Sequence, residues 1–210
     1  VSPGFDPNNA TQPDDEEKLE EFEKLTTEEQ NKYLFKLWRN PIVSDTYEPG
    51  STFKLITVSS ALEDRAITTS DTFSCNTYVN IAGINLHCWS ARDHGTQTVK
   101  EAVGNSCNPA FINYGLRIGN EKFYEYMRSF GLMNTTGIDL GGEAVGVFAA
   151  DSSFTQLDLA CYAFGQNFNT TPVALIAAQA ATVNGGYLHT PYVVERVVDS
   201  SGNVISSHDT

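Results

Sequence analysis

The sequence predicts a fold built mainly from α-helices, with a few short strands. Apolar residues recur at helical spacing in much of the chain between residues 14 and 184, whereas strand-like stretches are short and confined to residues 68–98 and 192–206. No alternating series of strands and helices is present, which argues against a parallel sheet. The 210 residues, 40% of them hydrophobic, suffice for one sizeable core.

Residues 1–13 are rich in Pro, Asn and Gly and predict an extended loop. Residues 14–38 form an acidic helical segment, in which residues 14–29 hold nine acidic residues and two lysines. Either Thr26 with Glu29 or Thr27 with Gln30 would cap the second helix of this segment. We interpret the acidic run as a solvated helix face. The formal net charge of −13 argues against a nucleic-acid partner, which would need a basic surface.

A turn at residues 47–50 leads into an amphipathic stretch, residues 51–64, which predicts a helix that starts near Ser51 and buries Phe53 and Ile56. Residues 68–98 are interpreted as an irregular excursion with β-prone pieces at 78–80 and 84–89. Helices are expected next at 99–103, 109–117, 121–130 and 171–184, followed by a terminal hairpin at 192–206.

The four cysteines do not settle the redox compartment, because a domain of this size needs no disulfides to fold. Cys75 and Cys88 fall in the same excursion and are expected to lie close enough to form a disulfide. Free buried thiols remain the alternative. A zinc set of Cys75, His87, Cys88 and His94 has a spacing that fits no compact ligand pattern, so no metal is expected.

Ser51-Thr52-Phe53-Lys54 places a hydroxyl and an amine one helical turn apart. An alcohol becomes a good nucleophile when a base removes its proton, and lysine serves as that base if burial lowers its pKa. Because a match of this length arises easily by chance, the motif has little meaning alone; an ordinary surface lysine is the alternative.

The surrounding segment resembles the first motif of the class B penicillin-binding proteins, especially their sporulation and division members. The resemblance covers nearly the whole chain and continues in Asp6-Pro7-Asn8-Asn9, Leu37-Trp38-Arg39-Asn40, Ser106-Cys107-Asn108-Pro109-Ala110-Phe111, Phe164-Gly165-Gln166 and Asn184-Gly185-Gly186. It implies that residues 1–210 are a partial transpeptidase domain, the helical lobe of the penicillin-binding and serine β-lactamase-like α/β fold without most of the central sheet.

The second motif of that family, Ser-x-Asn, occurs three times, beginning at Ser74, Ser106 and Ser201. Ser106 with Asn108 is favoured because it lies between two predicted helices and precedes the Pro-Ala-Phe that the resemblance expects. The third motif, Lys-Thr/Ser-Gly, does not occur in these residues. The resemblance therefore implies a chain that is itself poorly active.

The resemblance implies a D,D-transpeptidase that cross-links peptidoglycan stem peptides ending in D-Ala-D-Ala, with Ser51 as nucleophile and Lys54 as base. Ser106 would protonate the leaving amine and Asn108 would hold the substrate. β-Lactams would acylate Ser51, a cell-wall glycosyltransferase is a further partner, and no cofactor is required. The alternatives are a carboxypeptidase or β-lactamase-like hydrolase and a non-catalytic domain that binds β-lactam or peptide.

The same resemblance implies work outside the cytoplasmic membrane, with an anchor in a longer protein, although no signal peptide or membrane span is visible here. Glu101 and Asn105 mimic the E-x-x-x-N of hydrolytic β-lactamases. They directly precede Ser106 instead of lying well downstream, so we interpret that match as chance.

Overall fold

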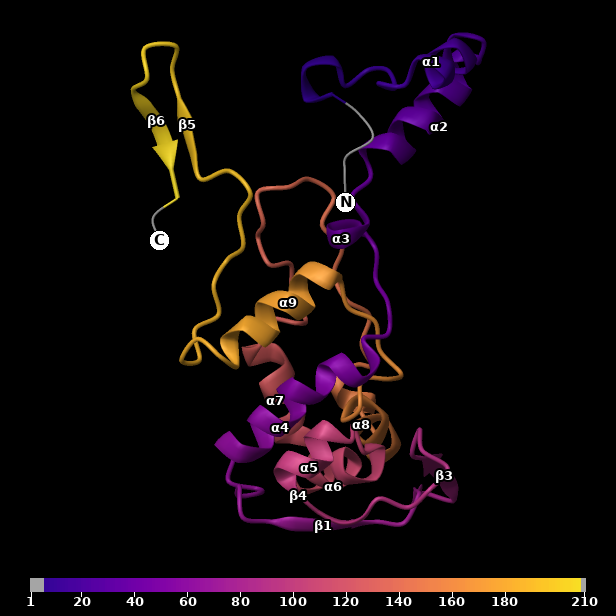
Figure 1. Ribbon diagram of the computed structural model, residues 1–210, viewed down its shortest axis with the longest axis vertical. Helices are drawn as coiled ribbons and strands as arrows, with labels where there is room; N and C mark the ends of the chain where they lie inside the picture. Colours follow the sequence, from indigo (N-terminus) through magenta and orange to yellow (C-terminus); the bar gives the residue numbers. More distant parts are fainter. Residues whose placement is uncertain (1–5, 209–210) are drawn as a thin grey trace.

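The computed structural model describes residues 6–208. A helical body lies at one end of the molecule, while the two N-terminal helices and the C-terminal hairpin extend from the other (Figure 1). The body contains the helices α4 (Lys54–Glu63), α5 (Val99–Gly104), α6 (Asn108–Ile118), α7 (Asn120–Ser129), α8 (Gln156–Tyr162) and α9 (Pro172–Ala181). The prediction of a mainly helical fold with a few short strands is confirmed. Residues 1–5 of the predicted N-terminal loop lie outside the described part.

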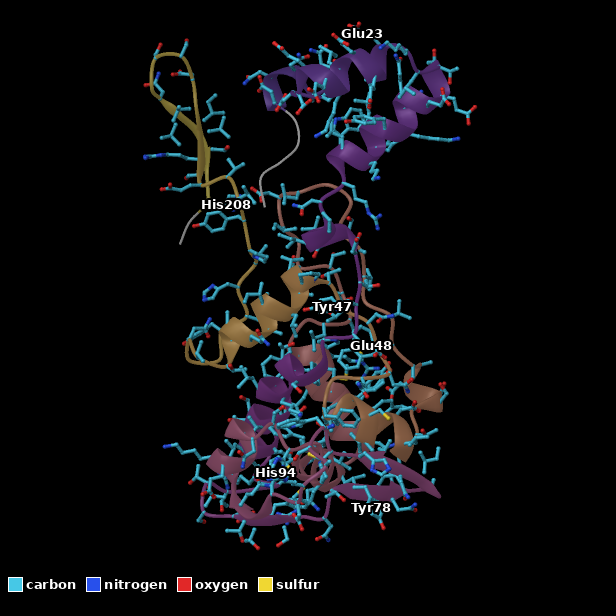
Figure 2. The ribbon with its side chains drawn as sticks, turned by 45° about the vertical axis from the view of Figure 1, so that its right-hand side comes forward. Glu23, Tyr47, Glu48, Tyr78, His94 and His208 are labelled. Carbon is cyan, nitrogen blue, oxygen red and sulfur yellow. The ribbon has the colours of Figure 1, made fainter. Side chains whose placement is uncertain are left out.

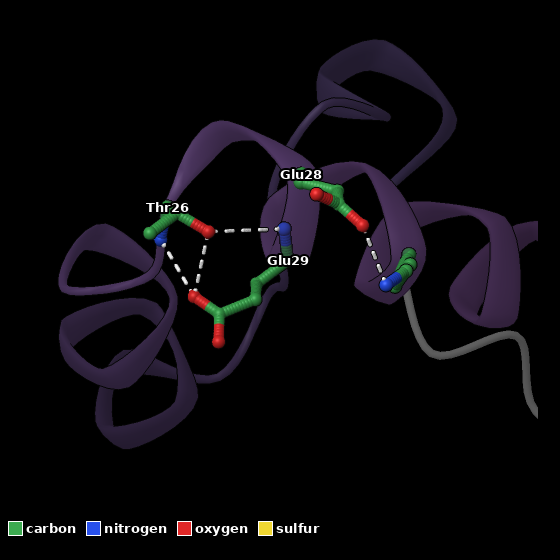
Figure 3. A network of polar contacts seen from close by, with 4 residues as sticks. Thr26, Glu28 and Glu29 are labelled. Carbon is green, nitrogen blue, oxygen red and sulfur yellow. Dashed lines mark hydrogen bonds and ion pairs between the residues drawn. The ribbon is translucent and has the colours of Figure 1, made fainter.

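The N-terminal helices α1 (Glu16–Glu23) and α2 (Thr27–Trp38) are stabilised largely by local interactions. Thr26 and Glu29 form a capping box, in which the Glu29 carboxylate accepts hydrogen bonds from the backbone and hydroxyl of Thr26 at 2.9 and 2.7 Å (Figure 3). Lys32 pairs with Glu28 one turn away, at 2.7 Å. A 3₁₀ turn, Pro7–Asn9, precedes these helices, and the short helix α3 (Pro41–Ser44) follows them.

Helix α6 lies at the centre of the body and contacts α4, α7, α8 and the strands β1 to β3. It can do so because most of its residues are apolar and buried, including Phe111 and Ile112. Aromatic side chains from distant parts of the chain join this core, and Tyr162 of α8 packs on Phe168 with ring centroids 4.7 Å apart. Helix α8 was not predicted from the sequence, although the capping box of Thr155 and Asp158 marks its start.

The strands in residues 6–208 form three separate antiparallel pairs. Strand β1 (Thr72–Cys75) pairs with β4 (Gly95–Thr98), β2 (Tyr78–Ile81) pairs with β3 (Ile84–His87), and β5 (Arg196–Val198) pairs with β6 (Val204–Ser207). The excursion is therefore more regular than its sequence indicated, because β1 and β4 pair although residues 76–94 separate them. None of the helices in the described part is long and apolar enough to span a membrane.

Candidate active site

The segment that carries Ser51 packs on the hydrophobic core through Phe53. It begins as a 3₁₀ turn, Gly50–Phe53, that continues directly into α4. Phe53 is fully buried, with its ring centroid 4.9 Å from that of Phe168, and Ile56 is buried beside it, as predicted. Ser51 itself is exposed. Burial of Phe53 turns the opposite face of the segment outward, and Ser51 lies on that face one turn before Lys54.

The backbone before Ser51 is fixed by a close contact with Gly165. Gly50 donates its N–H to the Gly165 carbonyl at 2.7 Å, and both glycines have positive φ angles, +56° and +87°. A Cβ at position 165 would lie 1.9 Å from the Gly50 oxygen, so only glycine fits there. Gln179 of α9 also donates a hydrogen bond to the Thr52 carbonyl at 2.7 Å. The sequence showed Gly165 as part of a family motif but gave no signal for Gln179.

Ser106 and Asn108 approach from the turn between α5 and α6. Ser106 has a φ of +51°, which is uncommon for a residue with a side chain and stores strain of order 1 kcal/mol or more. In this conformation the Ser106 hydroxyl donates a hydrogen bond to Ser51 Oγ at 3.0 Å. Asn108 donates its amide to the backbone carbonyl of His87 at 3.0 Å, so the excursion supports the turn.

Lys54 joins these groups. Its Nζ lies 3.2 Å from Ser51 Oγ, 2.9 Å from Ser106 Oγ, 2.8 Å from the Ser106 carbonyl oxygen and 2.6 Å from Asn108 Oδ1. The side chain is buried, with 4% of the residue exposed, and Nζ lies 5.3 Å from the centre of the Phe111 ring. The structure thus brings together all four residues that the sequence singled out.

Burial lowers the pKa of Lys54 from its ordinary 10.5 to about 8. The nearby thiols of Cys88 and Cys107 act in the opposite direction, and their effect is smaller. A lysine in this state has a neutral fraction near pH 7 that is far larger than that of a solvated lysine. It is therefore suited to accept a proton from a neighbouring hydroxyl.

The other sequence candidates lie in structural roles. Ser74 bonds to Thr96 across the β1–β4 pair at 2.9 Å, and Ser201 lies in the hairpin turn, where its N–H donates to Asp199. Glu101 caps α5 by accepting hydrogen bonds from the backbone and hydroxyl of Thr98, and these bonds lower its pKa. Such a carboxylate is committed to a helix cap, in keeping with the interpretation of the Glu101 motif as chance.

Cys75 and Cys88 lie close together, as expected, because their sulfur atoms are within 4.8 Å of one another. No disulfide joins them, and all four cysteines are free thiols in the structure, which is the alternative that the sequence left open. His94 and Cys107 belong to the same cluster, whereas His87 does not.

Known proteins resemble the chain along most of its length. Stage V sporulation protein D of Bacillus subtilis is 43% identical over 162 residues, which are 77% of this chain and 25% of that protein. The peptidoglycan D,D-transpeptidase PbpA of Mycolicibacterium smegmatis is 30% identical over 92% of this chain and 39% of its own length. The chain thus spans about a quarter to two fifths of these relatives.

Among solved structures, penicillin-binding protein 3 of Mycobacterium tuberculosis in complex with aztreonam has a TM-score of 0.73 and 26% identity, covering 81% of this chain and 38% of that one. The family model described as the penicillin-binding protein transpeptidase domain matches residues 2–210. With the sequence relatives and the shared fold, this match shows that the chain belongs to the penicillin-binding protein transpeptidase family, as a class B domain.

Proposed function

We propose that the protein containing this chain is a D,D-transpeptidase that cross-links peptidoglycan through an acyl-enzyme on Ser51. The observation that supports this most directly is the buried Lys54 amine within 3.2 Å of the Ser51 hydroxyl and 2.9 Å of the Ser106 hydroxyl. A nucleophile, a base and a second hydroxyl in mutual contact are the groups that acyl transfer needs.

Lys54 acts as the base in its neutral form, because an ammonium group has three N–H donors and no lone pair to accept a proton. Four oxygen atoms lie within 3.2 Å of its nitrogen. As a neutral amine, Lys54 donates its two N–H groups to the Ser106 carbonyl and Asn108 Oδ1, and its lone pair accepts the proton of Ser51. Ser106 donates its own hydroxyl proton to Ser51 Oγ.

In the first step, Ser51 Oγ attacks the carbonyl carbon between the two terminal D-alanines of a stem peptide while its proton passes to Lys54. The carbon–nitrogen bond then breaks. Ser106 delivers a proton to the departing D-alanine amine and regains one from Lys54, which leaves an ester on Ser51 and a neutral lysine. The α4 N-terminus stabilises negative charge that develops near Ser51, and Asn108 holds the peptide group of the substrate.

In the second step, the amine of a neighbouring stem peptide attacks the ester carbonyl. It loses a proton to Lys54, which returns that proton to Ser51 Oγ as the ester bond breaks, so that one amide has replaced another. A β-lactam enters the same first step, because its strained amide carbonyl stands in for the D-Ala-D-Ala bond.

The setting of this reaction follows from its substrate. Peptidoglycan lies outside the cytoplasmic membrane, so we propose that the protein acts there, held by an anchor. A glycosyltransferase that supplies the glycan strands is the partner that this chemistry requires. Penicillin-binding protein 2 of Helicobacter pylori is 25% identical to this chain, with a TM-score of 0.70. Its solved structure is a complex with another protein, MreC.

A fluorescent penicillin tests the proposal on the protein expressed at its natural length. We expect one label per molecule, complete loss of labelling in Ser51→Ala, and loss of at least about 10²-fold in rate in Lys54→Met, because a positioned base contributes roughly 10²–10⁴-fold. Ser59→Ala, a change in the same helix, is the control. Labelling that survives Ser51→Ala would overturn the assignment of Ser51 as the nucleophile. Release of the acyl group to water alone, with no transfer to an added D-amino acid or stem peptide, would indicate a hydrolase.

A further inference from the structure

A cluster of three thiols and one imidazole lies beside the candidate active site. Cys75, Cys88, His94 and Cys107 each offer one ligand atom, and these four atoms all lie within 4.8 Å of one another. Cys88 Sγ and His94 Nδ1 are 3.8 Å apart. The three cysteines are buried and His94 is half-buried. His94 lies at the end of the molecule opposite to Glu23 (Figure 2).

This geometry matches one tetrahedral ion. Zinc binds thiolates at about 2.3 Å and imidazole nitrogen at about 2.0–2.1 Å, so two sulfur atoms on one zinc lie roughly 3.8 Å apart. The observed limit of 4.8 Å therefore requires a contraction of at most about 1 Å. Three thiolates and an imidazole are ligands that magnesium and calcium do not favour. We propose that Cys75, Cys88, His94 and Cys107 bind a structural Zn²⁺.

A buried amide next to the cluster provides a second, independent observation. Gln97 has 2% of its surface exposed, and its Oε1 accepts a hydrogen bond from Asn105 at 2.8 Å. Its Nε2 has no hydrogen bond of regular geometry to any residue in the described part of the chain, although the side chain lies against the Cys107 sulfur. A thiol is a weak acceptor and a metal-bound thiolate is a stronger one, so the ion would give this buried donor its partner.

The ligands come from segments that the ion would tie together. Cys75 ends β1, Cys88 and His94 lie in the connection from β3 to β4, and Cys107 stands between Ser106 and Asn108. Zinc would thus fasten the excursion to the turn that carries two of the candidate catalytic side chains. Hydrogen bonds join the same parts, since Trp89 Nε1 donates to the Asn105 carbonyl at 2.9 Å. The metal touches no reacting atom and acts as a positioning element.

The ligands are widely spaced in the sequence, in the order C-x12-C-x5-H-x12-C, so no compact motif marks the site. The fourth ligand is Cys107, from the Ser-x-Asn motif, and not His87 of the excursion. On binding, three thiols lose their protons and one zinc joins three thiolates and a neutral imidazole, with a net charge of −1. No oxidant or reductant is consumed, in contrast to a disulfide, which needs an acceptor for two electrons.

The test measures metal in the chain purified with a reductant and without chelators. We expect inductively coupled plasma mass spectrometry to find one zinc per chain. The cobalt-substituted form should show the intense visible absorption of tetrahedral thiolate coordination. Cys107→Ser and His94→Ala should lose the zinc, whereas two matched controls, Cys161→Ser and His87→Ala, should keep it. Gln97→Ala should weaken zinc binding about 10–100-fold in a chelator competition.

Hydrogen exchange supplies a readout of the positioning role. Removal of zinc by a chelator should increase exchange in residues 72–98 and 105–108 while leaving α1 and α2 unchanged. The proposal is overturned if protein refolded with zinc and reductant retains none, or if Cys107→Ser and Cys161→Ser hold equal amounts. The cobalt spectrum of the unsubstituted chain decides the question if ligand variants do not fold, and an octahedral spectrum would also overturn the site.

Discussion

The two segments that form the candidate active site are held in place by different forces. The segment of Ser51 and Lys54 rests on the core through Phe53 and is fixed by the contact between Gly50 and Gly165. The turn of Ser106 and Asn108 has a strained backbone and depends on polar contacts with the excursion. Core packing thus determines where the nucleophile lies, whereas its partners, at the start of the buried helix α6, also depend on polar contacts with the excursion.

The largest expected effect concerns the packed segment. Phe53→Ala should lower the free energy of unfolding by about 3–5 kcal/mol, because it removes a fully buried aromatic ring and leaves a cavity. Leu55→Ala is the matched control. Leu55 lies two residues later with 43% of its surface exposed, so its loss should cost less than about 1 kcal/mol. Urea unfolding measures both, and equal losses would show that the core does not hold this segment.

A substitution in the polar segment should change the stability less, and the acylation rate more, than a substitution in the packed segment. Asn108→Ala leaves the buried Lys54 amine without one hydrogen-bond acceptor, which should cost about 1–3 kcal/mol, and it also removes the exposed hydrogen bond to the His87 carbonyl. We expect acylation by fluorescent penicillin to slow roughly 5–150-fold. The control is Asn85→Ala, an exposed amide of the excursion that bonds only to Asn80 among its described side-chain partners. An unchanged rate in Asn108→Ala would contradict the support that we assign to this turn.

The sequence predicted the packed segment better than the polar one, for a physical reason. The helix after Ser51 follows from a local apolar pattern, and the capping box at Thr26 from residues three apart. In contrast, β1 pairs with β4 across the excursion, Asn108 bonds to His87, and Cys107 meets Cys75, all between residues far apart in the chain. Such contacts have no periodicity. The motif resemblance identified Ser106 and Asn108 without indicating what supports them.

The pH dependence of acylation tests the junction of the two segments, where Lys54 contacts both. With its pKa lowered by burial to about 8, the neutral fraction of Lys54 should rise about tenfold per pH unit below that value and level off above it. The acylation rate should follow, with its midpoint near pH 8. A midpoint near 10.5 would mean that Lys54 is solvated. Lys54→Arg should abolish the profile, since a guanidinium does not lose its proton in this range.

The smallest effect distinguishes a helix that supports the site from one that does not. Thr98 caps α5, the helix that leads into Ser106, with a box of the same design as the one at Thr26 on α2. Thr98→Ala and Thr26→Ala should each remove about 1 kcal/mol from the helix that they cap. Because α5 continues directly into the turn of Ser106, only Thr98→Ala should also slow acylation, by a few-fold. Circular dichroism and the penicillin assay measure the two effects. An equal change of acylation in both variants would mean that the polar segment is coupled to the N-terminal helices, and that the separation between the two ways of holding the site does not hold.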